Sequence, residues 1–175
     1  MRMFIASPVY ITSEIESIVN SLSNIQNLKL TGINNFHITY LFLGEINVNE
    51  ANHIIGQLKQ ISSNKISARV SGIMAFPNIS HPRVIVIVAE SPCLLNLHDS
   101  VLRLLPEYKN IGRKFLPHIT IARVKNGTTL PDISRLSTTL STTHGRVSIK
   151  EMCLFKSVLT YEGPLYERIY CREFT

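Results

Sequence analysis

A four-residue pattern occurs twice in this chain and restricts what the chain can fold into. His37-Ile38-Thr39-Tyr40 returns almost half a chain length later as His118-Ile119-Thr120-Ile121. Both copies lie in runs of β-branched, aromatic and other apolar residues without a helical period, which predicts a strand for each. Residues i and i+2 of a strand point to the same side, so each copy presents an imidazole and a hydroxyl together. Two such strands facing each other would surround a small anion with two imidazoles and two hydroxyls.

A single H-x-[ST] match carries little weight, and the chain contains its own control. His98-Asp99-Ser100 fits the pattern, but it lies in a predicted helix, where positions i and i+2 diverge around the axis. We interpret His98 as an ordinary, partly exposed helix residue. The same interpretation applies to His53, His81 and His144.

Two structural alternatives compete with a catalytic interpretation of the paired histidines. Taken alone, each would be a strand histidine whose ring is bonded to a neighbouring carbonyl. The other alternative is a zinc site, which requires a third protein ligand. Neither an HxxxH spacing nor a flanking acid is present beside the two motifs.

The rest of the chain predicts alternating helices and strands, and therefore an α+β domain. We expect antiparallel or mixed sheets flanked by helices in a two-lobed, pseudo-twofold arrangement with a central cleft. Residues 1–175 would form one domain, with one HxT strand from each lobe. Ser13-x-x-Glu16 is expected to cap the first helix, and the Ser91 hydroxyl, followed by Pro92, the third. Helices are predicted at about 11–25, 49–61, 92–105 and 132–140, and further strands at 3–9, 28–33, 65–74, 83–90, 146–159 and 164–174.

Composition limits the partners and the compartment. The formal net charge of +6 favours an anionic partner, although the chain has no block of consecutive Lys or Arg and no Trp for a base-stacking platform. Cys93, Cys153 and Cys171 show no CxxC or metal-ligand spacing, so we expect buried, reduced thiols. The N-terminus indicates a first strand, not a signal peptide, and the longest apolar run is too short to cross a bilayer. A cytoplasmic protein without membrane contact is expected.

Three longer stretches make the chain resemble the 2H phosphoesterase superfamily. They are similar to its RNA 2′,3′-cyclic phosphodiesterase branch, whose members are often called 2′-5′ RNA ligases, and the resemblance covers the whole chain. The stretches are FHITYLFLGE (residues 36–45), GRKFLPHITIAR (112–123) and LFKSVLTYEGPLYE (154–167). The resemblance implies a two-lobed α+β fold whose HxT strands line a cleft. It also implies hydrolysis of a terminal 2′,3′-cyclic phosphate to a 2′-phosphomonoester, with no metal and no cofactor.

The motif residues suit that chemistry, because one imidazole can deprotonate water while another protonates the departing oxygen. By analogy with the family, His37 is expected to be the proton donor and His118 the proton acceptor, although a swap stays open. Thr39 and Thr120 would donate hydrogen bonds to the non-bridging phosphate oxygens.

Four further residues are candidates for substrate binding. The resemblance places Phe42 and Arg123 beside the nucleoside, Phe42 by stacking on the base and Arg123 by stacking or by contacting phosphate. Strict alternation puts both on the face opposite the histidines, with Leu41 and Ala122 next on the HxT face, so Phe42 and Arg123 need a bulge or a strand end to reach the cleft. A core Phe42 and a surface Arg123 are the alternative. Arg113 and Lys114 would add positive potential for an RNA end, or else form a solvated turn.

Other functions remain open at this point. A non-catalytic module that binds RNA ends or tRNA is one, and an activity on 2′-5′ linkages is another. ATP-driven ligation is disfavoured, since no GxxxxGK loop is present. The expected partners are RNA ends or cyclic nucleotides, with tRNA fragments as one candidate class, and the expected state is a monomer.

Overall fold

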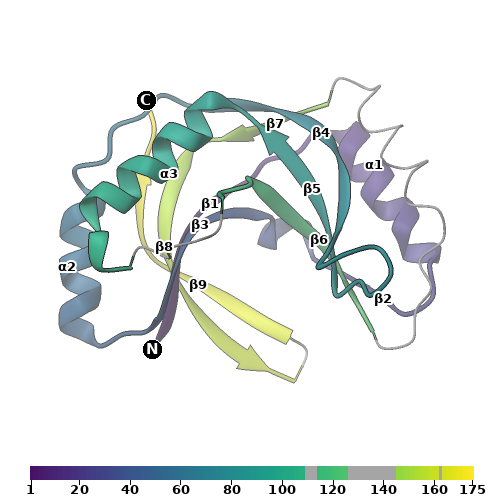
Figure 1. Ribbon diagram of the computed structural model, residues 1–175, viewed down its shortest axis with the longest axis horizontal. Coiled ribbons are helices and arrows are strands. Elements are labelled where there is room, and N and C mark those ends of the chain that lie inside the picture. The colour runs from purple at the N-terminus through teal and green to yellow at the C-terminus, as the bar shows by residue number, and fades with distance from the viewer. Residues whose placement is uncertain (109–113, 126–144, 162) are drawn as a thin grey trace.

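A curled antiparallel sheet dominates the computed structural model, which describes residues 1–108, 114–125, 145–161 and 163–175 (Figure 1). Nine strands within these ranges form one sheet in the order β7-β4-β5-β6-β3-β1-β8-β9, with β2 paired to β6. The α+β class is confirmed, and all of these strand pairs are antiparallel. The strands are β1 (Arg2–Pro8), β2 (Leu28–Leu30), β3 (His37–Glu45), β4 (Ile66–Phe76), β5 (Val84–Glu90), β6 (His118–Val124), β7 (Arg146–Ile149), β8 (Glu151–Thr160) and β9 (Gly163–Glu173).

The two motif strands meet in the middle of this sheet. β3 begins at His37 and β6 begins at His118, and the residue pair Ile38 and Ile119 joins them. On one side of this junction lie β5, β4 and β7, and on the other lie β1, β8 and β9. Each motif strand is therefore the innermost strand of one half of the sheet.

The helices cover the face that carries Ile38 and Ile119. Both isoleucines are fully buried in the main hydrophobic core. The helices α1 (Ser13–Ser21), α2 (Val48–Leu58) and α3 (Pro92–Leu104) contribute to this core, with α1 at the opposite end of the sheet from α2 and α3 (Figure 1). Short 3₁₀ turns lie at Leu22–Asn24, Ile33–Asn35 and Pro106–Tyr108. The HxT side chains alternate to the other face, which the helices leave open.

Two predicted helix caps were wrong. The Thr12 hydroxyl caps α1 by accepting from the Ile15 N–H, because the helix begins one residue earlier than the predicted box requires. Ser91 stands at the N-cap of α3, but its side chain makes no capping bond. α2 has a complete capping box instead, in which the side chains of Asn47 and Glu50 accept from each other's backbone N–H.

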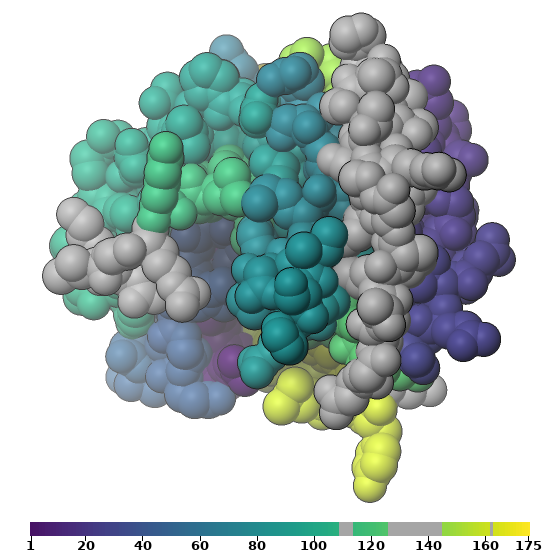
Figure 2. Space-filling view, turned by 45° about the vertical axis from the view of Figure 1, so that its right-hand side comes forward, coloured from purple at the N-terminus to yellow at the C-terminus, as the bar shows by residue number. Residues whose placement is uncertain are grey.

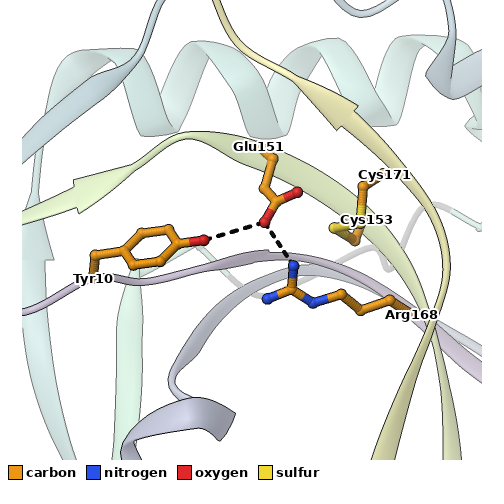
Figure 3. Close-up of a disulfide and its surroundings, with 5 residues drawn as sticks. All are labelled: Tyr10, Glu151, Cys153, Arg168 and Cys171. Atoms are coloured by element: carbon orange, nitrogen blue, oxygen red, sulfur yellow. Dashed lines mark hydrogen bonds and ion pairs between the residues drawn. A yellow bond between two sulfur atoms is a disulfide. The ribbon is translucent and has the colours of Figure 1, made fainter.

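The expectation of buried, reduced cysteines is also wrong. Cys153 and Cys171 stand directly opposite each other on β8 and β9 and form a disulfide, while Cys93 is an exposed free thiol (Figure 3). Facing cross-strand cysteines have close Cβ atoms, which a disulfide requires. The pairing depends on the hairpin register, which cysteine spacing alone does not reveal. Beside the disulfide, the Glu151 carboxylate accepts from Tyr10 and from Arg168, at 3.4 and 2.8 Å (Figure 3).

One predicted strand is divided in the structure, and three other predictions concern residues outside the described ranges. The predicted strand 146–159 is divided at Lys150 into β7 and β8. The predicted helix 132–140, Arg113 and His144 lie outside the described residues. In the described part of the chain, no helix has both the length and the apolar character needed to span a membrane.

Candidate active site

A β-bulge in each motif strand brings the fifth residue after the histidine, Phe42 in β3 and Arg123 in β6, to the face of the histidines. In β3, Ile5 of β1 pairs with Leu41 and Ala6 pairs with Thr39, so Tyr40 has no partner. In β6, Ile85 of β5 pairs with Ala122 and Val86 with Thr120, so Ile121 has none. The residue without a partner is the third after the histidine in both strands. An extra residue at this point reverses the side to which later side chains point.

The bulges decide which side chains reach the cleft. Leu41 and Ala122 are buried in the core, contrary to strict alternation. Phe42 and Arg123 share the face of the histidines and line the same cleft, with 70 % of Phe42 exposed. The alternative of a buried Phe42 is therefore wrong.

The cleft brings together six of the eight side chains proposed for the site. Its volume is about 730 Å³, within the range typical of small-molecule sites. Lys114 is exposed and is not among the lining residues, and Arg113 lies outside the described residues. The six predicted residues that line the cleft are His37, Thr39, Phe42, His118, Thr120 and Arg123.

Both catalytic candidates are held by the same kind of bond. His37 Nδ1 lies 2.7 Å from the Asn35 carbonyl oxygen, and His118 Nδ1 lies 2.8 Å from the Leu116 carbonyl oxygen. A carbonyl only accepts, so each Nδ1 must carry the proton and donate it. Each Nε2 is then the nitrogen that can accept or donate a proton in the cleft. The carbonyl bond expected of a structural histidine thus also presets a catalytic tautomer.

His37 has an aromatic surrounding that the sequence did not single out. Its ring centroid lies 5.3 Å from Phe4, 5.1 Å from Tyr166 and 6.3 Å from Phe155. Burial lowers the pKa of His37 below its ordinary value of 6.5, the Asn35 carbonyl opposes this, and the charges of His118 and Arg123 add to the lowering. Two of these neighbours, Phe155 and Tyr166, lie in the family-like stretch 154–167, which was the feature of the sequence that could have pointed to them.

His118 lies in a different environment. The Phe76 ring meets it edge-on, with 5.3 Å between the ring centroids. The two histidines are thus equivalent in tautomer and unequal in surroundings. Their surroundings differ because aromatic residues of β1, β8 and β9 lie beside His37, whereas an aromatic residue of β4 lies beside His118.

The other three described histidines lie outside the cleft, as expected. His98 is partly buried on α3 and stacks on Phe115, with 4.0 Å between ring centroids. His53 on α2 and His81 in the β4–β5 turn are exposed. Among the described residues, one group of three metal-ligating residue types comes together, namely Glu151, Cys153 and Cys171. Its two cysteines are joined in the disulfide, and it contains neither motif histidine.

A family model described as "LigT like Phosphoesterase" matches residues 6–86 and 92–166. The chain belongs to this family. Membership in the LigT-like phosphoesterases confirms the predicted 2H relationship. The match includes both motifs and reaches Tyr166 beside His37.

Curated relatives and solved structures extend the comparison. An RNA 2′,3′-cyclic phosphodiesterase of Methanocaldococcus jannaschii is 33% identical, with 97% of this chain and 98% of the relative covered. One of Archaeoglobus fulgidus is 31% identical, with 95% and 97% covered. The crystal structure of TT0787 of Thermus thermophilus has a TM-score of 0.78 at 22% identity, with 99% and 97% covered. E. coli LigT complexed with 3′-AMP has a TM-score of 0.74 at 18% identity, with 99% and 98% covered. These structures share the LigT-like fold.

Proposed function

We propose that this chain hydrolyses the 2′,3′-cyclic phosphate at an RNA 3′ end to a 2′-phosphomonoester, through metal-independent acid–base catalysis by His37 and His118. The prediction of an enzyme of the RNA 2′,3′-cyclic phosphodiesterase type is confirmed by relatives of about 30% identity over most of the chain. The observation that carries the mechanism is the pair of imidazoles, anchored alike through Nδ1, that line one cleft with two threonine hydroxyls.

The reaction needs two proton transfers at phosphorus. His118 Nε2 accepts a proton from the attacking water, and protonated His37 Nε2 donates one to the departing 3′ oxygen. The P–O3′ bond breaks as the new P–O bond forms, which leaves the phosphate on the 2′ oxygen. Thr39 and Thr120, two residues after each histidine on the same face, donate to the non-bridging oxygens and stabilise the charge that develops there.

The donor role requires His37 to be protonated, although the free protein disfavours this. A phosphodiester anion in the cleft supplies a negative charge close to His37 and offsets the repulsion from Arg123, so substrate binding raises the pKa of His37. Protonation of the acid is thereby coupled to occupancy of the site.

Phe42 and Arg123 hold the nucleoside in this proposal. The largely exposed Phe42 ring offers a stacking surface for the terminal base. Arg123 supplies positive charge near the cyclic phosphate, as its effect on the pKa of His37 indicates. One neighbouring structure, that of E. coli LigT, is a complex with 3′-AMP, a nucleotide of the kind such a site would hold.

The test is product analysis on an RNA oligonucleotide that ends in a 2′,3′-cyclic phosphate, in the presence of EDTA. We expect a 2′-phosphomonoester as the only product. A 3′-phosphomonoester would contradict the assignment of the leaving oxygen, and loss of turnover in EDTA would contradict metal independence. Tight, salt-dependent binding without turnover would support the RNA-binding module instead.

A further inference from the structure

The cleft extends beyond the motif residues to β2 and to the tip of the β8–β9 hairpin. Lys29, Leu159 and Gly163 all line it, together with the six predicted residues. The hairpin projects from the body of the protein at the lower side of Figure 1, and its tip stands out at the bottom of Figure 2. Substrate in the cleft can therefore also contact residues of β2 and of the hairpin.

Two cations stand side by side in this part of the cleft. Lys29 of β2 and Arg123 of β6 are directly opposite each other in the strand ladder, and both line the cleft. Like charges that face each other across a ladder repel. An anion placed between them removes this repulsion and binds both, so the pair fits a phosphate.

The side chain of Lys29 lies against Gly163 of the hairpin. Lys29 Nζ lies 3.7 Å from the point that a Cβ on Gly163 would occupy, and Gly163 has φ +124°, a conformation that favours glycine. The ammonium group thus reaches from β2 to the start of β9. Next to this contact, Leu159 lines the cleft and is 73 % exposed.

The order of charges along the cleft matches a nucleotide with phosphate on both sides. Arg123 acts electrostatically on His37 and so lies near the reacting phosphate, while Lys29 neighbours Arg123 in the ladder. A terminal nucleotide in RNA carries the cyclic phosphate on its 2′ and 3′ oxygens and a phosphodiester on its 5′ oxygen. A free cyclic mononucleotide lacks the second group.

We propose that Lys29 binds the phosphodiester on the 5′ side of the terminal nucleotide, with Arg123 beside it between this phosphodiester and the cyclic phosphate, and that Leu159 contacts the nucleoside before it. This inference rests on the proposed function and deepens it. It makes an RNA strand of two or more nucleotides, not a cyclic mononucleotide, the preferred substrate class.

The test compares adenosine 2′,3′-cyclic phosphate with the dinucleotide ApA ending in a 2′,3′-cyclic phosphate. In the wild type, kcat/KM should be higher for the dinucleotide. Lys29→Met should lower the dinucleotide-to-mononucleotide ratio of kcat/KM roughly tenfold or more, as expected when a charged hydrogen bond is lost. Lys59→Met, on an exposed lysine outside the cleft, is the matched control and should keep the wild-type ratio.

A second pair of variants examines the hairpin. Leu159→Ala should lower the same ratio, whereas Leu165→Ala should not, because Leu165 is 58 % exposed but does not line the cleft. Equal ratios for Lys29→Met and wild type would overturn the inference, and so would an equal fall in Lys59→Met.

Binding keeps this test separate from the test of the reaction. Equilibrium affinity is measured for ApA carrying a 2′-phosphate and for adenosine 2′-monophosphate. Lys29→Met should selectively weaken binding of the dinucleotide. It should also reduce the slope of log K against log[salt] for the dinucleotide by about 0.7, the value for one contact to a single strand. If the wild type shows no turnover on either substrate, the proposed function fails, and this binding comparison still decides on the subsite.

Discussion

Ile38 and Ile119 face each other as the residue pair that joins β3 to β6, and each stands between the histidine and the threonine of its motif. Because both isoleucines point into the core, the residues on either side of each must point into the cleft. This one pairing therefore brings two imidazoles and two hydroxyls to a common site.

Replacing either motif histidine should abolish most of the activity. For His37→Ala or His118→Ala we expect kcat to fall by at least about 100-fold, the lower limit of typical acid–base contributions. The rate is measured on an RNA ending in a 2′,3′-cyclic phosphate, with circular dichroism to verify folding. His53→Ala removes an exposed helical histidine outside the cleft and should retain the wild-type rate. A fully active variant at either motif position would refute the mechanism.

Phe42→Ala should impair substrate binding more than stability. Loss of a stacked base contact costs about 1–3 kcal/mol in affinity, which would appear as a higher KM. Truncation of a buried phenylalanine would instead cost roughly 3–5 kcal/mol of folding free energy. Since 70 % of Phe42 is exposed, we expect a much smaller loss, measured by urea unfolding. Phe42→Trp should preserve the low KM, and a large loss of stability in Phe42→Ala would argue for a core role.

The pKa of His37 should lie below 6.5 in the free protein and rise when a nucleotide binds. Burial and the positive charges of His118 and Arg123 disfavour its protonation. Arg123→Gln removes one of these charges and should raise the pKa of His37. An NMR titration of the imidazole, with and without adenosine 2′-monophosphate, measures both changes. A pKa that is unaffected by the nucleotide would contradict the proposed coupling.

The same lowered pKa predicts a pH dependence of stability. Between the folded pKa of His37 and its ordinary value of 6.5, the unfolded chain binds more protons than the folded one, so the free energy of unfolding rises with pH. This contribution is complete above about 6.5 and is lost as the pH falls through that window. Urea unfolding of wild type and His37→Gln across the window should show a smaller pH dependence in the variant.

Reduction of the disulfide should destabilise the protein. Cys153 and Cys171 are 18 residues apart, and closing a loop of this size contributes about 3 kcal/mol. The midpoint of unfolding should fall when dithiothreitol is added to the wild type. It should not respond in Cys153→Ala/Cys171→Ala, which lacks the bond, whereas Cys93→Ala should behave as wild type because Cys93 is an exposed free thiol. An equal response to dithiothreitol in the double variant would exclude the bond as the cause.

The sequence alone predicted four of the residues that line the candidate site. The period of two in a strand is a local property of the backbone, so His37 and Thr39 could be assigned to one face without any knowledge of the fold. The same holds for His118 and Thr120. The α+β class likewise followed from local patterns of apolar residues. The place of the motifs in a cleft was expected from the family resemblance, which depends on the spacing of the two motifs and on the residues around them.

Tertiary structure decided the rest. The bulges at Tyr40 and Ile121 bring Phe42 and Arg123 into the cleft, contrary to strict alternation. Strand register also places Lys29 opposite Arg123 and Cys153 opposite Cys171. The physical reason is that register depends on how distant strands pack and pair, and a shift of one residue reverses every side chain that follows it. Local sequence determines that side chains alternate between the two faces of a strand. Only the pairing of strands determines where a bulge shifts this alternation by one residue.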